Sequence, residues 1–361
     1  MSSTLSTFRE WINPNRGRHR TVPPMDTGLR PNLRLDEATE LLPPGRYEPD
    51  DVVTTRAGAV FFSSENLVLE YGDGEGVLRA QFSSKVTALA ARGDEVVAAV
   101  EGRGLCAISP SGAVAEICTD PSVTSCVTAL TGTADGALLV AVGSTAGQSA
   151  EWTHALVTGD RSGQIVRVDG ARARVVAEGL AWPSGIGMAS DRDVLVSVSL
   201  EHRVELRELA ALGDRGRTVT ANLPLYPGRI GVADDGYWFA APYVRNRVTE
   251  MLLDEPEVLA EMVGTISRDE WFVPRLHSED PFTETMQMGQ LRVLGVVKSW
   301  APARSCGLVF RMDRAGRVVE SAHARVDSKR HGVTGVTVRD GQVIAATRGY
   351  GNLLKLQVHN R

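Results

Sequence analysis

The sequence predicts an all-β fold, a single six-bladed β-propeller, on two observations. One strand-turn-strand pattern recurs six times between Tyr47 and Val358, and each copy reads as a short apolar strand, a polar turn and a β-branched strand. The first four spacings between the turns are 36, 42, 56 and 44 residues, which suits propeller blades of roughly 40 to 50 residues. The turns are centred on Gly58, Asp94, Gly136, Arg192, Gly236 and Gly341.

Several repeats continue into a second hairpin. Residues 104–118, 163–180 and 307–323 show this clearly, and two hairpins make a four-stranded blade. A β-sandwich is the alternative, because its short strands also recur roughly every 8 to 12 residues. It does not explain why turn, strand and second hairpin return in the same order, so we predict the propeller. The six repeats begin at Glu48, Lys85, Cys126, Trp182, Tyr226 and His331.

Two segments lie outside the repeats. Residues 1–44 are rich in Pro and Arg, and we predict an N-terminal arm that wraps the outside of a propeller formed by residues 45–361. The last turn spacing is 105 residues, which is too long for one blade. We assign the excess to an insertion between blades five and six, residues 251–306, where helical patterns at 252–263 and 270–276 predict a lid.

Composition limits the classes of function. Charged residues make up 23% of the chain and the net charge is −5, which argues against a broad phosphate-binding face for nucleic acids. No apolar run reaches the roughly 18 residues of a membrane span, and the N-terminus lacks the apolar core of a secretion signal. The four cysteines show no CxxC or zinc-ligand spacing. We therefore expect a cytoplasmic protein with reduced thiols and neither a nucleic-acid nor a membrane partner.

Three stretches of sequence carry a family resemblance. They are GLAWPSGIGMASDRDVLVSVSLEHRVELREL at 179–209, NLPLYPGRIGVADDGYWFAAP at 222–242 and RHGVTGVTVRDGQVIAATRGYGNLLKLQV at 330–358. Between Tyr47 and Val358 the chain resembles the strictosidine synthase-like branch of the gluconolactonase (senescence marker protein) superfamily of six-bladed propellers. The resemblance implies a small-molecule substrate, usually a lactone or related ester that is hydrolysed. It also implies one divalent cation, usually calcium, in the central tunnel.

The positions that the resemblance assigns to the metal ligands are altered in this chain. Asp50, with Glu48 alongside, keeps an acid at the first position. Ser184 and Gly228 stand where the family has Asn and Asp, and Arg229 brings a positive charge next to the second of these. Calcium prefers roughly six to eight oxygen ligands. We therefore expect either no cofactor or a single calcium ion held through Asp50 and Glu48.

Three residues are candidates for catalysis. His331 precedes the sixth inner strand, and its imidazole suits a general base that activates water; a solvated loop residue is the alternative. His154 lies in the long loop of the third repeat beside Trp152, which suits stacking on a substrate ring. The alternative is that Trp152 anchors this loop and His154 is incidental. Asp50 suits a carboxylate that orients a histidine, or else a solvated strand cap.

Further polar residues are candidates for binding the substrate at the mouth of the tunnel. Arg229, Tyr243 and Arg245 flank the fifth hairpin, and arginines there suit bidentate binding of a carboxylate or phosphate. Pairing with nearby acids is the alternative for these arginines. Ser184 and Thr334 open the inner strands of the fourth and sixth repeats. In the synthase of the family that this chain resembles, a glutamate acts near the position that Thr334 occupies here. The absence of a glutamate at this position disfavours condensation of an amine with an aldehyde.

The residues taken together predict a hydrolase of a small-molecule lactone, ester or amide-like bond, with His331 or His154 activating water. A strictosidine synthase-like enzyme that makes or cleaves C–N or C–C bonds is one alternative, and a non-catalytic ligand-binding propeller is another. No GxSxG, HExxH or Walker motif is present. The insertion at 251–306 leaves a homodimer open, because it suits a dimer contact as well as a lid.

Overall fold

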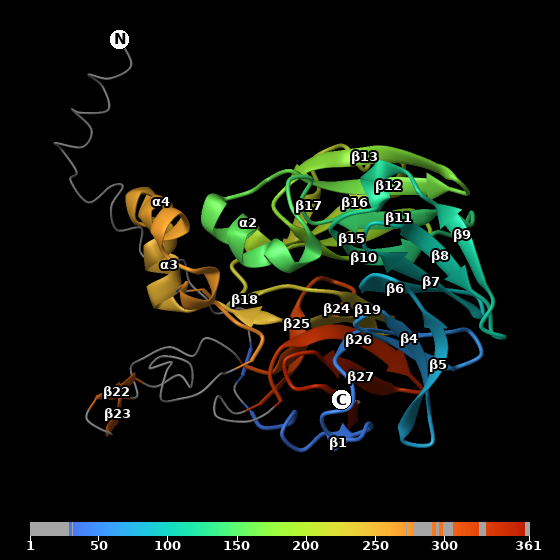
Figure 1. Cartoon of the computed structure of the whole chain (residues 1–361), viewed down its shortest axis with the longest axis horizontal. Coiled ribbons are helices and arrows are strands. Elements are labelled where there is room, and N and C mark those ends of the chain that lie inside the picture. The colour runs from blue at the N-terminus through green and yellow to red at the C-terminus, as the bar shows by residue number, and fades with distance from the viewer. Residues whose placement is uncertain are drawn as a thin grey trace, which may run out of the picture.

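The six-bladed propeller predicted from the sequence is confirmed. The computed structural model describes residues 29–30, 32–271, 273–277, 291–293, 296–298, 306–324 and 330–357. These residues form six four-stranded antiparallel sheets arranged around one axis, as Figure 1 shows. In the blades the first strand of each repeat is innermost, so the six first strands surround a central channel.

The blades follow one another along the chain. Blade one is β2 (Pro49–Thr54), β3 (Val60–Ser64), β4 (Leu67–Gly72) and β5 (Glu75–Gln81). Blade two is β6 (Val86–Arg92), β7 (Glu95–Val100), β8 (Gly104–Ile108) and β9 (Val114–Cys118). Blade three is β10 (Val127–Gly132), β11 (Leu138–Val142), β12 (Gly163–Asp169) and β13 (Arg172–Leu180).

The second half of the ring has the same plan. Blade four is β14 (Pro183–Met188), β15 (Asp193–Val198), β16 (Arg203–Glu208) and β17 (Arg217–Thr220). Blade five is β19 (Ile230–Ala233), β20 (Gly236–Ala240), β24 (Leu308–Asp313) and β25 (Val318–His323). Blade six is β26 (Val333–Arg339), β27 (Gln342–Thr347), β28 (Asn352–Gln357) and, from the other end of the chain, β1 (Thr39–Glu40).

The strand β1 closes the ring. It pairs antiparallel with β28, with Thr39 opposite Lys355, and so supplies the outermost strand of the last blade. Next to it, the buried Asn352 side chain accepts a hydrogen bond from Leu42 N at 2.9 Å and donates one to Leu42 O at 2.9 Å. Residues 39–40, expected within an outer arm, are thus part of a blade, whereas residues 1–28 lie outside the described residues.

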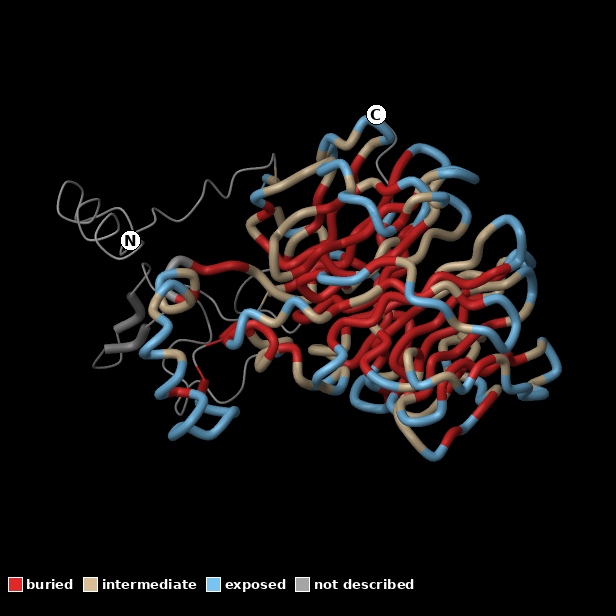
Figure 2. Tube along the Cα trace, turned by 90° about the horizontal axis from the view of Figure 1, so that it is seen from above, coloured by how far each residue is buried: buried red, intermediate tan, exposed pale blue. Residues whose placement is uncertain are grey.

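The core lies between the faces of neighbouring blades. Alternate residues of each strand point to one face of its sheet, and blades one and two meet through Phe61, Val68, Leu89 and Val96, all buried. Figure 2 shows the strands largely buried and the connecting loops exposed. Since each apolar face is covered by the next blade, the domain needs no second layer to bury its core.

The large insertion lies inside blade five. The prediction from the sequence, which placed it between blades five and six, is wrong on this point. It leaves the sheet after β20 and returns at β24, because Phe239 of β20 pairs with Phe310 of β24. The chain between them contains β21 (Tyr243–Val244), which pairs with β18 (Leu225–Tyr226), then α3 (Arg247–Leu253) and α4 (Pro256–Thr265). It continues through the 3-10 helix η5 (Arg268–Glu270) and the paired strands β22 (Leu291–Val293) and β23 (Val296–Lys298).

The helices predicted in the insertion are present in part. The pattern at 252–263 ends α3 and forms most of α4, with the break at Asp254 and Pro256 at the start of the second helix, where proline is well tolerated. The helix predicted over 270–276 is wrong. After η5 the described residues continue without a helix, because Pro274 lacks the amide hydrogen that a helix needs there.

A shorter helical segment sits inside blade three. It joins β11 to β12 through η2 (Ser149–Glu151) and α2 (Trp152–Thr158). In Figure 1 the helices α2, α3 and α4 lie together beside the blades. The remaining 3-10 turns are η1 (Pro121–Val123), η3 (Ser199–Glu201) and η4 (Leu209–Ala211).

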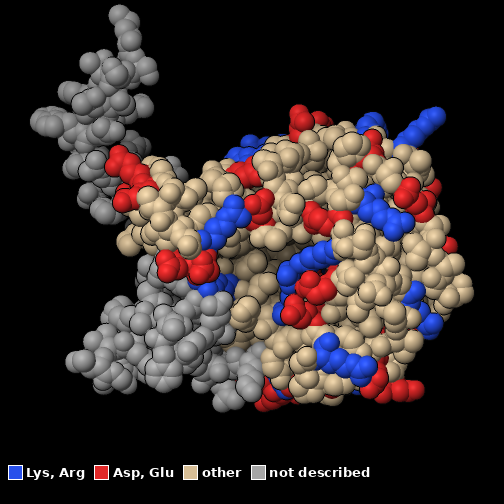
Figure 3. Space-filling view, in the orientation of Figure 1, with Lys and Arg blue, Asp and Glu red and all other residues tan. Residues whose placement is uncertain are grey.

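The surface is mixed in charge. Figure 3 shows Lys and Arg interspersed with Asp and Glu over the visible face, without a large area of one sign. Within the described ranges, no helix has the length and apolar character needed to cross a bilayer. The four cysteines are free thiols, and three of them are buried.

Candidate functional site

The inner strands deliver polar residues to one level of the channel. In blades one, two, three, four and six the pairing between the first and second strands shifts register at one point. Such a bulge leaves a residue out of the ladder, so its carbonyl and side chain are available for other contacts. The bulged residues are Asp50 and Asp51, Thr87, Thr128, Ser184 and Thr334.

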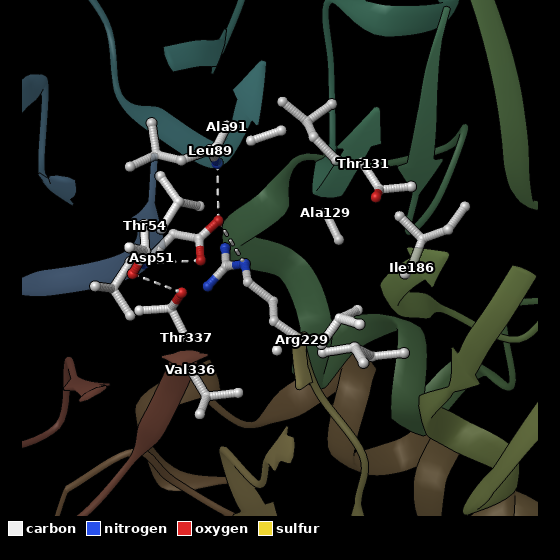
Figure 4. A pocket seen from close by; sticks show the side chains of 18 of the residues that line it. Asp51, Thr54, Leu89, Ala91, Ala129, Thr131, Ile186, Arg229, Val336 and Thr337 are labelled. Atoms are coloured by element: carbon white, nitrogen blue, oxygen red, sulfur yellow. Dashed lines mark hydrogen bonds and ion pairs between the residues drawn. The ribbon is translucent and has the colours of Figure 1, made fainter. Parts of the chain in front are cut away.

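In blade five the same place is taken by Arg229. Gly228 N donates to Ala240 O at 2.8 Å and Ala240 N donates to Arg229 O at 3.0 Å. Gly228 and Arg229 therefore both lie opposite the single residue Ala240. The Arg229 side chain extends into the channel, as Figure 4 shows. It is almost fully enclosed, with 13% of the side chain exposed.

The Arg229 guanidinium binds four other blades at once. It donates through Nη1 and Nη2, and through Nε, to backbone carbonyls that the bulges turn inward. It also lies 3.5 Å from Asp50 Oδ1 and 3.3 Å from Asp51 Oδ2. The carbonyl partners are Asp50 O at 2.8 Å, Thr334 O at 2.9 Å, Thr87 O at 2.5 Å and Thr128 O at 3.0 Å.

Hydroxyl groups connect neighbouring blades at the same level. Thr128 Oγ1 donates to Pro183 O at 2.5 Å, from blade three to blade four. Ser184 Oγ donates to Pro227 O at 2.5 Å, from blade four to blade five. Thr334 Oγ1 donates to Asp50 O at 2.7 Å, from blade six to blade one. These bonds link three of the six pairs of neighbouring blades at the level of Arg229.

Arg229 separates two cavities along the axis. The first has a volume of about 320 Å³ and is lined by the later parts of the inner strands. Its only carboxylate among the described lining residues is Asp51, which accepts hydrogen bonds from Leu89 N and Val52 N, both at 2.8 Å. Burial raises the pKa of Asp51, although Arg229 opposes this shift. Figure 4 shows Ile186 and Val336 on this wall together with the hydroxyl side chains of Thr54, Thr131 and Thr337.

The second cavity lies at the mouth of the channel, where the inner strands begin. Its volume is about 100 Å³. Asp50, Lys85 and Arg348 are its charged lining residues besides Arg229. Burial alone would raise the pKa of Asp50, but the positive charges of Arg229, Arg348 and Lys85 together lower it. Burial lowers the pKa of Lys85, and Asp50 acts against that shift. The mouth thus holds an ionised carboxylate among cations.

An aromatic wall bounds this mouth cavity. Trp152 of α2 stacks on Tyr243 of β21, with ring centroids 3.9 Å apart and an interplanar angle of 16°. Tyr226 packs edge-on against Trp152 at 5.0 Å. Burial raises the pKa of Tyr243 to about 12, so its hydroxyl is protonated at neutral pH. Leu276 of the insertion completes the wall, so blade three and the insertion cover the mouth together.

A larger groove of about 830 Å³ joins the mouth cavity. Tyr243, Leu276 and Arg348 line both spaces, so they mark the passage between them. The rest of the groove is formed by the start of blade one, the loop after β27 and the insertion after η5. A ligand held at the mouth has room to extend along this groove.

Six of the residues predicted from the sequence line the mouth cavity together. Each comes from the start of an inner strand, from a bulge or from a segment that covers the mouth. The closed ring of blades brings them together. They are Asp50, Trp152, Ser184, Arg229, Tyr243 and Thr334.

The other predicted residues lie elsewhere. His331 is 2% exposed, and neither it nor His154 lines any of the three cavities. The His154 ring faces Trp271 at 6.3 Å. Arg245 is buried outside the cavities and donates to Glu250 Oε2 at 2.5 Å, which attaches α3 to the blade. Glu48 is exposed on the groove and not at the channel centre.

Lys85, Thr87 and Arg348 are among the lining residues of the mouth cavity that were not predicted. Thr87 is the bulged residue of blade two, and Lys85 precedes it by two positions. Counting eight residues back from the turn at Asp94, which is the distance from Gly58 to Asp50, gives Val86, which lies between them. Arg348 follows β27 and returns to the mouth from the end of a second strand. Its sequence, TRGYG, carries no signal that predicts this position.

The residues at the channel centre do not fit a divalent cation. The oxygens that would serve as ligands already accept hydrogen bonds from Arg229 or face its charge. A metal ion there would meet the guanidinium at close range in a buried site, which is strongly repulsive. In the part of the chain that the structure describes, no three His, Cys, Asp or Glu residues converge as a ligand group. Arg229 supplies the positive charge at the place where the resemblance implies a metal.

Comparison with known proteins identifies the fold. No family model and no curated protein matches the chain. A gluconolactonase from Xanthomonas campestris matches with a TM-score of 0.56 at 12% identity, over 90% of this chain and 91% of its own. A calcium-binding regucalcin from Agrobacterium tumefaciens matches with a TM-score of 0.52 at 13% identity, over 90% of this chain and 92% of its own. The chain shares the propeller fold of these proteins. At such identities its chemistry rests on its own residues.

Proposed function

We propose that this chain is a hydrolase of small-molecule lactones or esters that acts at the mouth of the channel without a metal ion. The observation that carries the proposal is the Asp50 carboxylate, which lines the mouth cavity and is kept ionised by the surrounding cations. The fold that the chain shares with a gluconolactonase supports the same class of reaction. The sequence favoured a histidine as the base, but among the described residues that line this cavity Asp50 is the carboxylate.

Asp50 is suited to accept a proton from water. The water oxygen forms a bond to the carbonyl carbon of the substrate while its proton passes to the Asp50 carboxylate. The tetrahedral oxyanion forms next to Lys85, whose charge stabilises it in the enclosed cavity. When the carbon–oxygen bond to the leaving group breaks, the alkoxide takes the proton back from Asp50. Arg229 keeps the Asp50 backbone in place throughout, through the 2.8 Å hydrogen bond to its carbonyl.

A hydrolysis assay with matched variants tests the proposal. We expect turnover of at least one member of a panel of five- and six-membered lactones and aryl esters, with the same rate in the presence of EDTA. Asp50→Asn should lower kcat by about 100-fold or more, the usual effect of losing a general base. The control is Asp51→Asn, because Asp51 also contacts Arg229 but faces the other cavity. Full activity of Asp50→Asn would rule out the base, and chelator-sensitive turnover restored by calcium would rule out the metal-free site.

A ligand-binding propeller without turnover is the second candidate. Arg229 favours it, because a guanidinium with four hydrogen-bonded carbonyls stabilises the channel and contributes no reactive group. Binding to the mouth cavity with no turnover across the panel, in the wild-type protein and at every pH tested, would select this candidate.

A further inference from the structure

Arg348 stands at the passage between the mouth cavity and the groove. Its side chain is half-buried and lines both spaces. Among the residues that the structure describes, no acceptor forms a hydrogen bond or ion pair with this guanidinium. Arg229, by contrast, uses its donors on the channel wall. Arg348 is therefore the arginine whose planar set of N–H donors faces the space that a ligand would enter.

Lys85 adds a second cation on the same cavity. Its side chain is also without a hydrogen bond or direct ion pair to the described residues, and it faces Asp50, with Glu65 at the rim and Arg348 nearby. Arg229 is balanced by its contacts with Asp50 and Asp51. The mouth therefore has a small surplus of positive charge, which suits one negative charge on a ligand and disfavours a dianion beside Asp50.

We propose that Arg348, assisted by Lys85, binds a carboxylate group of the ligand, and that the ligand is a small monocarboxylic acid or a lactone or ester that carries one. Guanidinium and carboxylate match in a bidentate geometry, which a lysine cannot reproduce. The stacked Trp152 and Tyr243 next to this position favour a planar or aromatic body. The rest of the molecule extends into the groove. As a statement about substrate the inference rests on the proposed hydrolase, but the binding itself does not.

Calorimetric titration with a charged and a neutral probe tests the inference. The probes are phenylacetate and phenylacetamide, which have nearly the same shape and differ in charge. We expect the wild-type protein to bind phenylacetate at roughly millimolar concentration or below and to prefer it to the amide. Arg348→Gln should weaken phenylacetate binding about 10- to 100-fold, the effect of losing a charge-assisted contact, and should leave the amide unchanged. Arg348→Lys should be intermediate.

The control is Arg46→Gln. Arg46 lines the same groove but is exposed and already paired with Glu75 at 3.0 Å, so its removal should not change binding. Thermal unfolding of each variant shows whether the fold is kept. Equal binding of the two probes, no phenylacetate binding by the wild type, or the same loss in Arg46→Gln as in Arg348→Gln would overturn the inference. Absence of lactone turnover would count against the hydrolase alone, because these titrations do not need turnover.

Discussion

Arg229 donates a hydrogen bond from Nη1 to the backbone carbonyl of Asp50 at 2.8 Å, across the channel from blade five to blade one. The two residues are 179 positions apart in the chain, so this bond exists only when the ring is closed. The same guanidinium reaches three further blades, and the charge that stabilises the inward-facing oxygens is therefore part of the chain itself.

Removing this charge should expose a latent cation site. In Arg229→Ala the carboxylates of Asp50 and Asp51 and four carbonyls lose the buried positive charge that they share, which we expect to cost about 3–5 kcal/mol of unfolding free energy. Six oxygens of this kind suit calcium, so millimolar calcium chloride should raise the Tm of the variant and leave the wild type unchanged.

The control for this experiment is Arg245→Ala. Arg245 is another buried arginine, paired with Glu250 at 2.5 Å and away from the channel, so its loss should lower the Tm without a response to calcium. An Arg229→Ala protein that is as stable as the wild type, or that ignores calcium, would contradict the role given to the guanidinium.

The rate of hydrolysis should not decrease in mild acid. Because the cations at the mouth lower the pKa of Asp50 below its usual 3.8, the carboxylate remains ionised as the pH falls from neutral toward that value. A plot of kcat/KM against pH should therefore be flat on the acid side until about pH 4, whereas a histidine base would lose activity near pH 6.5. A fall of activity centred near pH 6.5 would support a histidine in place of Asp50.

His202 should make the fold sensitive to acid. It lies between Tyr226 and Glu250 with 12% of its side chain exposed, and its partial burial, followed by the charge of Arg245, lowers its pKa to about 4. The unfolded chain takes up the proton near pH 6.5, so the stabilisation is complete above that pH and is lost as the pH falls toward 4.

We expect the unfolding free energy of the wild type to decrease by about 3 kcal/mol from this group over that interval. His202→Gln should show a smaller decrease, measured by urea unfolding at pH 7 and pH 4.5. The same pH dependence in both proteins would show that other groups cause it.

Closure of the ring should depend on Asn352. Its side chain is 1% exposed and satisfies both Leu42 N and Leu42 O. Asn352→Ala leaves two backbone groups unpaired, which we expect to cost about 1–3 kcal/mol for each group that stays buried. Hydrogen exchange of the amides in β1 and β28 should become faster. Lys355→Ala, on the same strand and opposite Thr39, is the control and should change exchange little.

The repeats in the sequence were sufficient to predict the fold. Local sequence patterns predicted the structure less reliably where a repeat is interrupted by an insertion. The alternation of apolar residues and the regular turns predicted six blades because each blade is built from neighbours in the chain. The insertion was misplaced because the apolar run at β24 pairs with β20, although 67 residues lie between Ala240 at the end of β20 and Leu308 at the start of β24. Helix propensity suggested a helix after Glu270, where Pro274 prevents it.

The sequence alone determined the propeller fold, the strand of each blade that lies at the channel and six of the residues that line the mouth. It did so because the spacing of the turns sets which residues face the axis. Only the tertiary structure decided what those residues do. It enclosed Arg229 among carbonyls of four other blades, turned Asp50 and Asp51 to opposite cavities, buried His331 away from them and brought Arg348 to the mouth. The physical reason is that charge, burial and pairing depend on groups far apart in the chain, which meet only when the ring closes.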